Sequence, residues 1–151
     1  MGCLTIGLSC SPDSPVARES DVAITPVPGP EVITGSTRMK AGTATKLVLN
    51  MLSTGTMIRL GKVYGNLMVD VRATNEKLKA RARRIVMQSA DVSLEQAESM
   101  LDQTGYDVRL AVFALLARLD PDTARARLEQ AGSRIHHALA ELDREVSQES
   151  R

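Results

Sequence analysis

The residues from Gly29 to Ala44 are the part of this sequence whose types and spacing are best suited to hold a ligand. They read GPEVITGSTRMKAGTA, and a long apolar segment with helical spacing follows them. The first turn of a helix presents unpaired backbone N–H groups and the positive end of the helix dipole, and both attract anions. This pattern predicts a site for a phosphate, a carboxylate or the hydroxyl groups of a sugar. The polar side chains that would line the site are Glu31, Ser36, Thr37, Arg38 and Lys40.

A simpler interpretation of the same segment is purely structural. Thr34 or Ser36 could cap the helix, because serine and threonine are common N-caps, and the two cations could be solvated. Glu31 is the only acidic residue of the segment and follows a proline, whereas acid–base catalysis usually relies on paired carboxylates. The residues alone leave both interpretations open.

The other residues with reactive side chains indicate structure rather than chemistry. Cys3 and Cys10 have no CxxC spacing and no histidine nearby, so we predict no metal site. His136 and His137 are adjacent and point in different directions on a helix, which is typical of surface residues. A basic run is expected to form a solvated helix face, and it consists of Arg72, Lys77, Lys79, Arg81, Arg83 and Arg84.

Composition narrows the class of partner. The net charge is +1 and aromatic residues make up 2% of the chain, so neither electrostatics nor base stacking favours a nucleic acid. The sequence contains no run of 18 apolar residues, so it predicts no membrane span. The first residues lack the pattern of a signal peptide. These features predict a cytoplasmic protein without nucleic-acid or membrane partners.

The elements that must position the candidate site are of the α/β type. Residues 3–8 and 21–25 are short and apolar, as in strands of a parallel sheet that is buried on both faces, and residues 16–19 allow one helical turn between them. A long helix is predicted from Met39 to Leu60. It is apolar round most of its surface, so we expect it to be buried on two sides.

The rest of the chain is predicted to be helical. Residues 62–71 form a non-helical connection, and a helix over 76–89 is capped by Thr74 or Asn75. Ser93 and Gln96 have capping-box spacing, with Leu94, Ala97 and Leu101 facing inward. Further helix boundaries are indicated by Gly105, Asp107, Asp120-Pro121 and Gly132, and the last helix is predicted from Ser133 through Leu142.

Two short strands do not make a stable parallel sheet by themselves, because such sheets are covered on both faces. We therefore expect either a second subunit or an absent amino-terminal part, and we favour the absent part.

Residues 29–86 resemble N-acetylmuramic acid 6-phosphate etherases of the sugar isomerase (SIS) family, and the flanking segments are similar to that family too. The resemblance implies an α/β-then-all-α fold: a partial doubly wound parallel sheet, then a small helical, ubiquitin-associated-like bundle. The expected parts are the rear half of a sugar-phosphate domain over 1–65, a connection over 66–73, a bundle over 74–143 and a flexible tail over 144–151.

The resemblance also implies a function. The family cleaves the D-lactyl ether of N-acetylmuramic acid 6-phosphate to N-acetylglucosamine 6-phosphate and D-lactate during cell-wall sugar recycling. It implies no metal or organic cofactor and a homodimer. It places the substrate against Glu31, Ser36, Thr37, Arg38 and Lys40. The catalytic residues are expected before Met1, so the chain by itself is expected to be weakly active or inactive. The alternative is a non-catalytic sugar-phosphate-binding protein that resembles the glucokinase regulatory protein.

Overall fold

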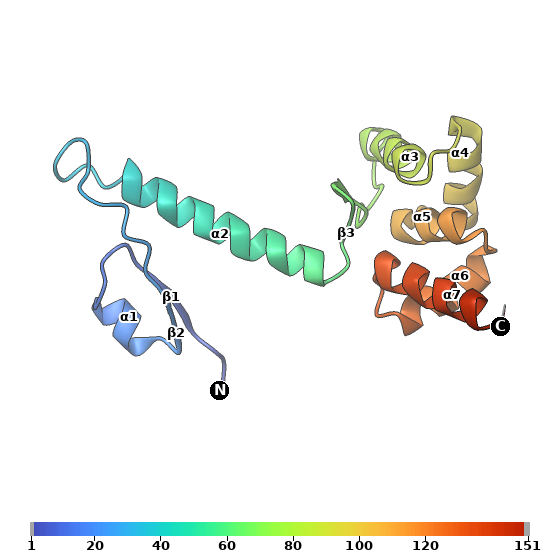
Figure 1. Ribbon diagram of the computed structural model, residues 1–151. Coiled ribbons are helices and arrows are strands. Elements are labelled where there is room, and N and C mark those ends of the chain that lie inside the picture. The colour runs from blue at the N-terminus through green and yellow to red at the C-terminus, as the bar shows by residue number, and fades with distance from the viewer. Residues whose placement is uncertain (1, 150–151) are drawn as a thin grey trace. The chain divides into compact units, whose positions relative to one another are not determined.

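A computed structural model of the protein describes residues 2–149, and these divide into two compact units after Gly55. The division falls within the segment 1–65 that was expected to form the first domain. The first unit holds a small sheet and most of one long helix, and the second holds a hairpin and five helices (Figure 1).

The first unit contains a two-stranded parallel sheet, as the sequence predicts. Strands β1 (Ile6–Leu8) and β2 (Val22–Ile24) pair with Ile6 opposite Val22, and helix α1 (Pro15–Glu19) connects them. Gly7 allows helix α1 to lie close against β1. A Cβ atom at this position would be only 2.8 Å from the Val16 carbonyl oxygen. The prediction that this sheet is buried on both faces is wrong, since Ile6 and Val22 are 52% and 42% exposed. Within the first unit, the described part of the sheet consists of two short strands with one short connecting helix, which is too little to cover both faces.

Helix α2 (Lys40–Arg59) confirms the predicted long helix but not its burial. None of its residues is buried, and Leu47, Leu49 and Met51 are each more than half exposed. Apolar periodicity indicates which surface a helix offers for packing, and it does not indicate whether a partner lies against that surface. The expectation that this helix is covered on two sides is therefore wrong for the described residues.

A short hairpin follows α2, where the sequence predicted only a non-helical connection. Strands β3 (Val63–Tyr64) and β4 (Leu67–Met68) are antiparallel, with Tyr64 opposite Leu67. Gly65 and Asn66 form the two-residue turn, and Gly65 has a φ of +58°, which favours glycine at the first turn position of such hairpins.

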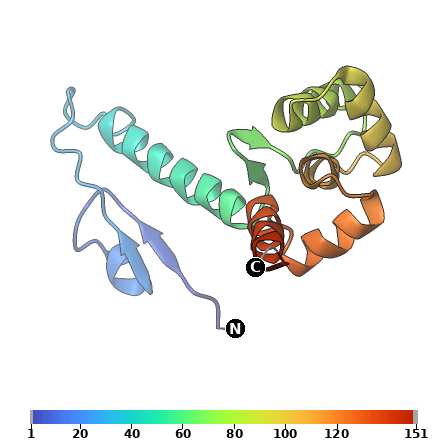
Figure 2. The ribbon, with the colours of Figure 1, turned by 45° about the vertical axis from the view of Figure 1, so that its right-hand side comes forward.

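The second unit is a bundle of five helices around a single hydrophobic core. Its helices are α3 (Glu76–Ala90), α4 (Leu94–Gln103), α5 (Val108–Ala117), α6 (Pro121–Gln130) and α7 (Ile135–Glu149). Helix α5 packs against each of the other four, and Figure 2 shows it within the bundle. The largest fully buried side chains include Phe113, Leu101 and Leu110, of which two belong to α5. This helix is therefore the centre of the core.

The helix boundaries in the bundle confirm the predicted caps. The side chains of Asn75, Ser93, Asp107 and Asp120 each accept a hydrogen bond from a backbone N–H group in the first turn of their helix. Both halves of the capping box at Ser93 are present. The glycines predicted to end helices, Gly105 and Gly132, have φ angles of +62° and +64°. Local sequence signals are strong here because each cap depends on residues within one turn.

Two details of the bundle differ from the expectation. Leu94 was expected to face inward but is 49% exposed, since it lies at the first position of α4. Helix α7 continues to Glu149, through most of the segment expected to be a flexible tail. Polarity in that segment indicates exposure rather than the end of a helix, and Arg127 on α6 pairs with Glu145 at 2.6 Å. Residues 150 and 151 lie outside the described residues.

The observed fold is mostly helical, with an α/β first unit and an all-α bundle preceded by a hairpin. The only parallel pairing among the described residues is that of β1 with β2. Within residues 2–149, no helix has the length and apolar character needed to cross a membrane.

Candidate functional site

The segment that the sequence singles out forms a series of turns leading into α2. The carbonyl oxygen of Ile33 accepts a hydrogen bond from the Ser36 N–H at 2.9 Å, and that of Ser36 accepts one from the Met39 N–H at 3.2 Å. Gly35 has a φ of +82°, a conformation in which a side chain would be strained. The turns place the hydroxyl-bearing residues immediately before the start of the helix.

Glu31 closes this loop by capping α2 from nine residues away. Its Oε2 atom accepts a hydrogen bond from the Lys40 N–H at 2.9 Å, and its Oε1 atom accepts one from the Ala41 N–H at 3.0 Å. These N–H groups lower the pKa of the Glu31 carboxyl, the Ala41 contact being the larger cause. The sequence predicted free N–H groups at this helix end, but an internal carboxylate binds two of them. Glu31 is held in its ionised form and positions the loop.

Lys40 also has a contact within the loop. Its ammonium group donates a hydrogen bond to the Pro30 carbonyl oxygen at 3.0 Å, so the loop is tied to the helix by its side chain as well as its backbone.

The remaining predicted residues present side chains that are available to a ligand. Thr37 and Arg38 are exposed and Ser36 is half-buried. Among the described residues, none of these three side chains takes part in a hydrogen bond or an ion pair, although the Thr37 carbonyl oxygen accepts from the Gly42 N–H. Two hydroxyls and a guanidinium group on consecutive residues just before α2 therefore have no hydrogen-bond or ion-pair partner in the part of the chain that the structure describes.

The loop after β1 lies beside the same helix end. The Cys10 thiol is 3.5 Å from the Ala41 carbonyl oxygen and 3.7 Å from the Thr45 hydroxyl. Loops at the carboxyl ends of parallel strands are the usual ligand-binding edge of α/β folds. The loops that leave β1 and β2 therefore meet at the start of α2. No pattern in the sequence indicated that Cys10 would lie at this helix end.

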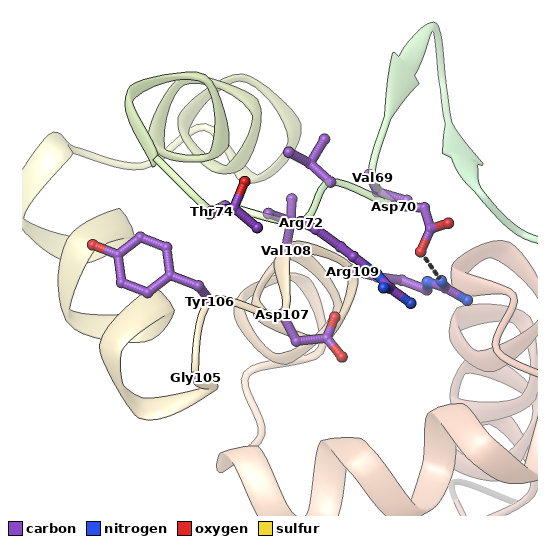
Figure 3. A pocket seen from close by; sticks show the side chains of 11 residues that line it. Val69, Asp70, Arg72, Thr74, Gly105, Tyr106, Asp107, Val108 and Arg109 are labelled. Carbon is purple, nitrogen blue, oxygen red and sulfur yellow. Dashed lines mark hydrogen bonds and ion pairs between the residues drawn. The ribbon is translucent and has the colours of Figure 1, made fainter. Parts of the chain in front are cut away.

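A cleft of about 380 Å³ lies in the helical unit between the extended segment after β4 and the start of α5 (Figure 3). Asp70 forms ion pairs with Lys62 and with Arg109, both at 2.8 Å. The hydrogen bond from Lys62 is the largest cause of the lowered pKa of Asp70. Asp107 caps α5 through the Leu110 N–H. Both carboxylates of this cleft are thus engaged in holding the fold.

The basic run and the histidines are largely as the sequence predicts. Arg72, Lys77, Arg81 and Arg84 are exposed, and so are both histidines. Arg83 and Lys79 differ because both are half-buried. Arg83 pairs with Glu98 on α4 at 2.6 Å, and the Lys79 ammonium pairs with Glu76 at 3.1 Å and lies 5.7 Å from the centroid of the Tyr106 ring. Within residues 2–149, no group of three or more histidine, cysteine or acidic side chains is placed to hold a metal ion.

Known proteins resemble the chain over nearly all of its length. The family model of the C-terminal lid domain of glucokinase regulatory protein matches residues 65–112. The N-acetylmuramic acid 6-phosphate etherase of Vibrio campbellii is 60% identical over 139 residues, which are 92% of this chain and 45% of that protein. The enzyme of the same name from Clostridium beijerinckii is 54% identical over 143 residues, or 95% of this chain and 47% of that protein. The chain spans about half the length of the curated relatives it matches.

Proposed function

We propose that this chain, which is homologous over nearly its whole length to the carboxy-terminal portion of N-acetylmuramic acid 6-phosphate etherases, contributes one wall of the sugar-phosphate site of such a lyase. The reaction cleaves the D-lactyl ether of N-acetylmuramic acid 6-phosphate and gives N-acetylglucosamine 6-phosphate and D-lactate. Sequence identity of 54–60% over at least 92% of the chain is the observation that carries this proposal.

Within this wall, the unpartnered side chains before α2 would contact the substrate. A guanidinium group binds phosphate or carboxylate through two parallel hydrogen bonds, so Arg38 suits an anionic group of the sugar. The hydroxyls of Ser36 and Thr37 suit phosphate oxygens or ring hydroxyls. Glu31 and Lys40 would position this loop, since their side chains already bind its backbone.

We assign no proton-transfer step to these residues. Elimination of lactate needs a base at C2 of the opened sugar and an acid at the leaving oxygen. Glu31 is a poor base, because its carboxylate accepts two backbone hydrogen bonds and its pKa is lowered. In this proposal the reaction uses no metal or organic cofactor, and the acid and base lie outside this chain.

The same resemblance supports finer proposals about the assembly. The pair β1–β2 would be part of a larger SIS-type parallel sheet, which would cover the apolar surface of α2. The assembly would be a cytoplasmic homodimer that acts in amino-sugar recycling. The exposed apolar residues of α2 support a covering sheet or subunit, because such surfaces mark contacts with other protein segments.

A chimera tests the function directly. We expect the Vibrio campbellii etherase, with its matching segment replaced by this chain, to release D-lactate from N-acetylmuramic acid 6-phosphate. In that chimera, Arg38→Gln should lower kcat/KM by about tenfold or more, because a charge-assisted contact to the substrate is lost. Arg18→Gln changes an exposed arginine of α1 and is the matched control. A folded chimera that releases no lactate, or equal rates for both variants, would contradict the proposal.

A second candidate function is non-catalytic regulation through sugar-phosphate binding. The match of residues 65–112 to the lid domain of glucokinase regulatory protein favours it. The chimera distinguishes the two, since a regulator would bind N-acetylglucosamine 6-phosphate without lactate release.

A further inference from the structure

A basic cleft of about 380 Å³ lies in the helical unit, between the end of α2, the β3–β4 hairpin and the first turn of α7. Every ionisable side chain that lines it is basic, and these are Arg59, Arg134, His136 and His137. All four are exposed, and neither arginine forms an ion pair within residues 2–149. Arginines and lysines on protein surfaces are usually interspersed with acidic residues, so two arginines in a lining without an acidic residue indicate an anionic ligand.

The packing around Gly61 brings these residues together. Gly61 is buried with a φ of +69°, and a Cβ atom there would lie 2.5 Å from the Ser133 carbonyl oxygen. The same Cβ would lie 2.8 Å from Cγ of Arg134, so the aliphatic stem of this arginine rests against the chain just after α2. The Tyr64 ring of the hairpin lies 4.8 Å from the ring of His136, centroid to centroid. These contacts hold Arg134 and His136 in the cleft.

The lining is not entirely polar. Ile58, Val63 and Ile135 contribute apolar side chains to the cleft. A volume of this size falls within the range of small-molecule sites, about 300–1,000 Å³, which combine apolar walls with a few polar groups. The cleft is larger than a single oxyanion requires, and the apolar residues suit an organic group attached to the anion.

We infer that this cleft binds the phosphate group of a small organic phosphate or inorganic phosphate itself. Arginine side chains match the geometry of phosphate oxygens, and the imidazole N–H groups add further donors. The first turn of α7 contributes its positive end to the same space. This site goes beyond the proposed function, which uses Ser36, Thr37 and Arg38 in the other unit, so either proposal can fail without the other.

The chain offers a direct readout, because its two histidines are both in this cleft. We expect the imidazole NMR signals of the complete chain to shift and saturate on titration with N-acetylglucosamine 6-phosphate or inorganic phosphate, and to stay unchanged with N-acetylglucosamine. Tighter binding of the sugar phosphate would identify an organic phosphate as the ligand, and equal affinity would identify phosphate itself. Absence of saturable shifts with both phosphates would overturn the inference.

The double variant Arg59→Gln/Arg134→Gln tests which residues carry the binding. Glutamine keeps the Cβ and Cγ atoms that pack on Gly61, so the fold and the thermal midpoint should be preserved. We expect the affinity for phosphate to fall by about tenfold or more, since two charge-assisted contacts are removed. Arg144→Gln, at an exposed position further along α7, is the control and should leave the affinity for phosphate unchanged. Equal affinity in the double variant and the wild type would refute the assignment.

Discussion

At the scale of single residues, Glu31 shows how a polar side chain in a candidate site can be structural. Its carboxylate binds the first N–H groups of α2 from nine residues away, so it replaces the N-cap that usually precedes a helix directly. Sequence patterns indicate caps only within one turn, so Thr34 or Ser36 was the predicted cap of this helix. Glu31 was predicted to line the site, but its capping role depends on a turn geometry that the sequence does not indicate.

Glu31→Gln should loosen the start of α2 in a pH-dependent way. The folded pKa of Glu31 is lowered, so its stabilisation is present above its unfolded pKa and is lost as the pH falls through the folded value. Amide hydrogen exchange at Lys40 and Ala41 should be several-fold faster in the variant than in the wild type near neutral pH. The ratio of the two exchange rates should approach one in acid. Glu19→Gln, at an exposed position of α1, is the control. A ratio that stays constant with pH would rule out the capping role.

At the scale of elements, what the sequence predicted depends on how local the signal is. The caps at Asn75, Ser93, Asp107 and Asp120 were predictable because donor and acceptor lie within three residues. The Gly65-Asn66 hairpin was missed although its turn pair is a known hairpin signal, because the flanking strands have only two residues each. The contact of Gly61 with the α6–α7 turn joins residues more than 70 positions apart, so no local sequence pattern predicts it.

Gly61→Ala should therefore destabilise the second unit more than Gly65→Ala does. Both glycines have a positive φ, which costs an added side chain about 1–2 kcal/mol. A Cβ at Gly61 would also clash with the Ser133 carbonyl, whereas nothing lies within 4 Å of one at Gly65. We expect losses of about 1 kcal/mol for Gly65→Ala and about 3 kcal/mol for Gly61→Ala in urea denaturation. Similar losses for both variants would show that the backbone conformation alone sets the cost.

At the scale of the whole molecule, the two units differ in what holds them together. The buried apolar side chains all lie between Val69 and Ala138, in the second unit. The first unit buries little, and no residue of its longest helix is buried. In α5, at the centre of the core, every residue but Arg109 is apolar, whereas the apolar residues of the longer helix α2 remain at least partly exposed. The free energy of folding should therefore come mainly from the bundle.

Phe113→Ala tests this division at the centre of the bundle. Phe113 is fully buried on α5, and removal of such a ring costs about 3–5 kcal/mol, a large part of the stability of a small domain. Leu49→Ala removes an apolar side chain of α2 that is 53% exposed and should change the stability by less than about 0.5 kcal/mol. Urea denaturation of the complete chain, followed by circular dichroism, measures both. A loss at Leu49 comparable with that at Phe113 would mean that the chain covers α2 in solution, by self-association for example, and that the bundle is not its main source of stability.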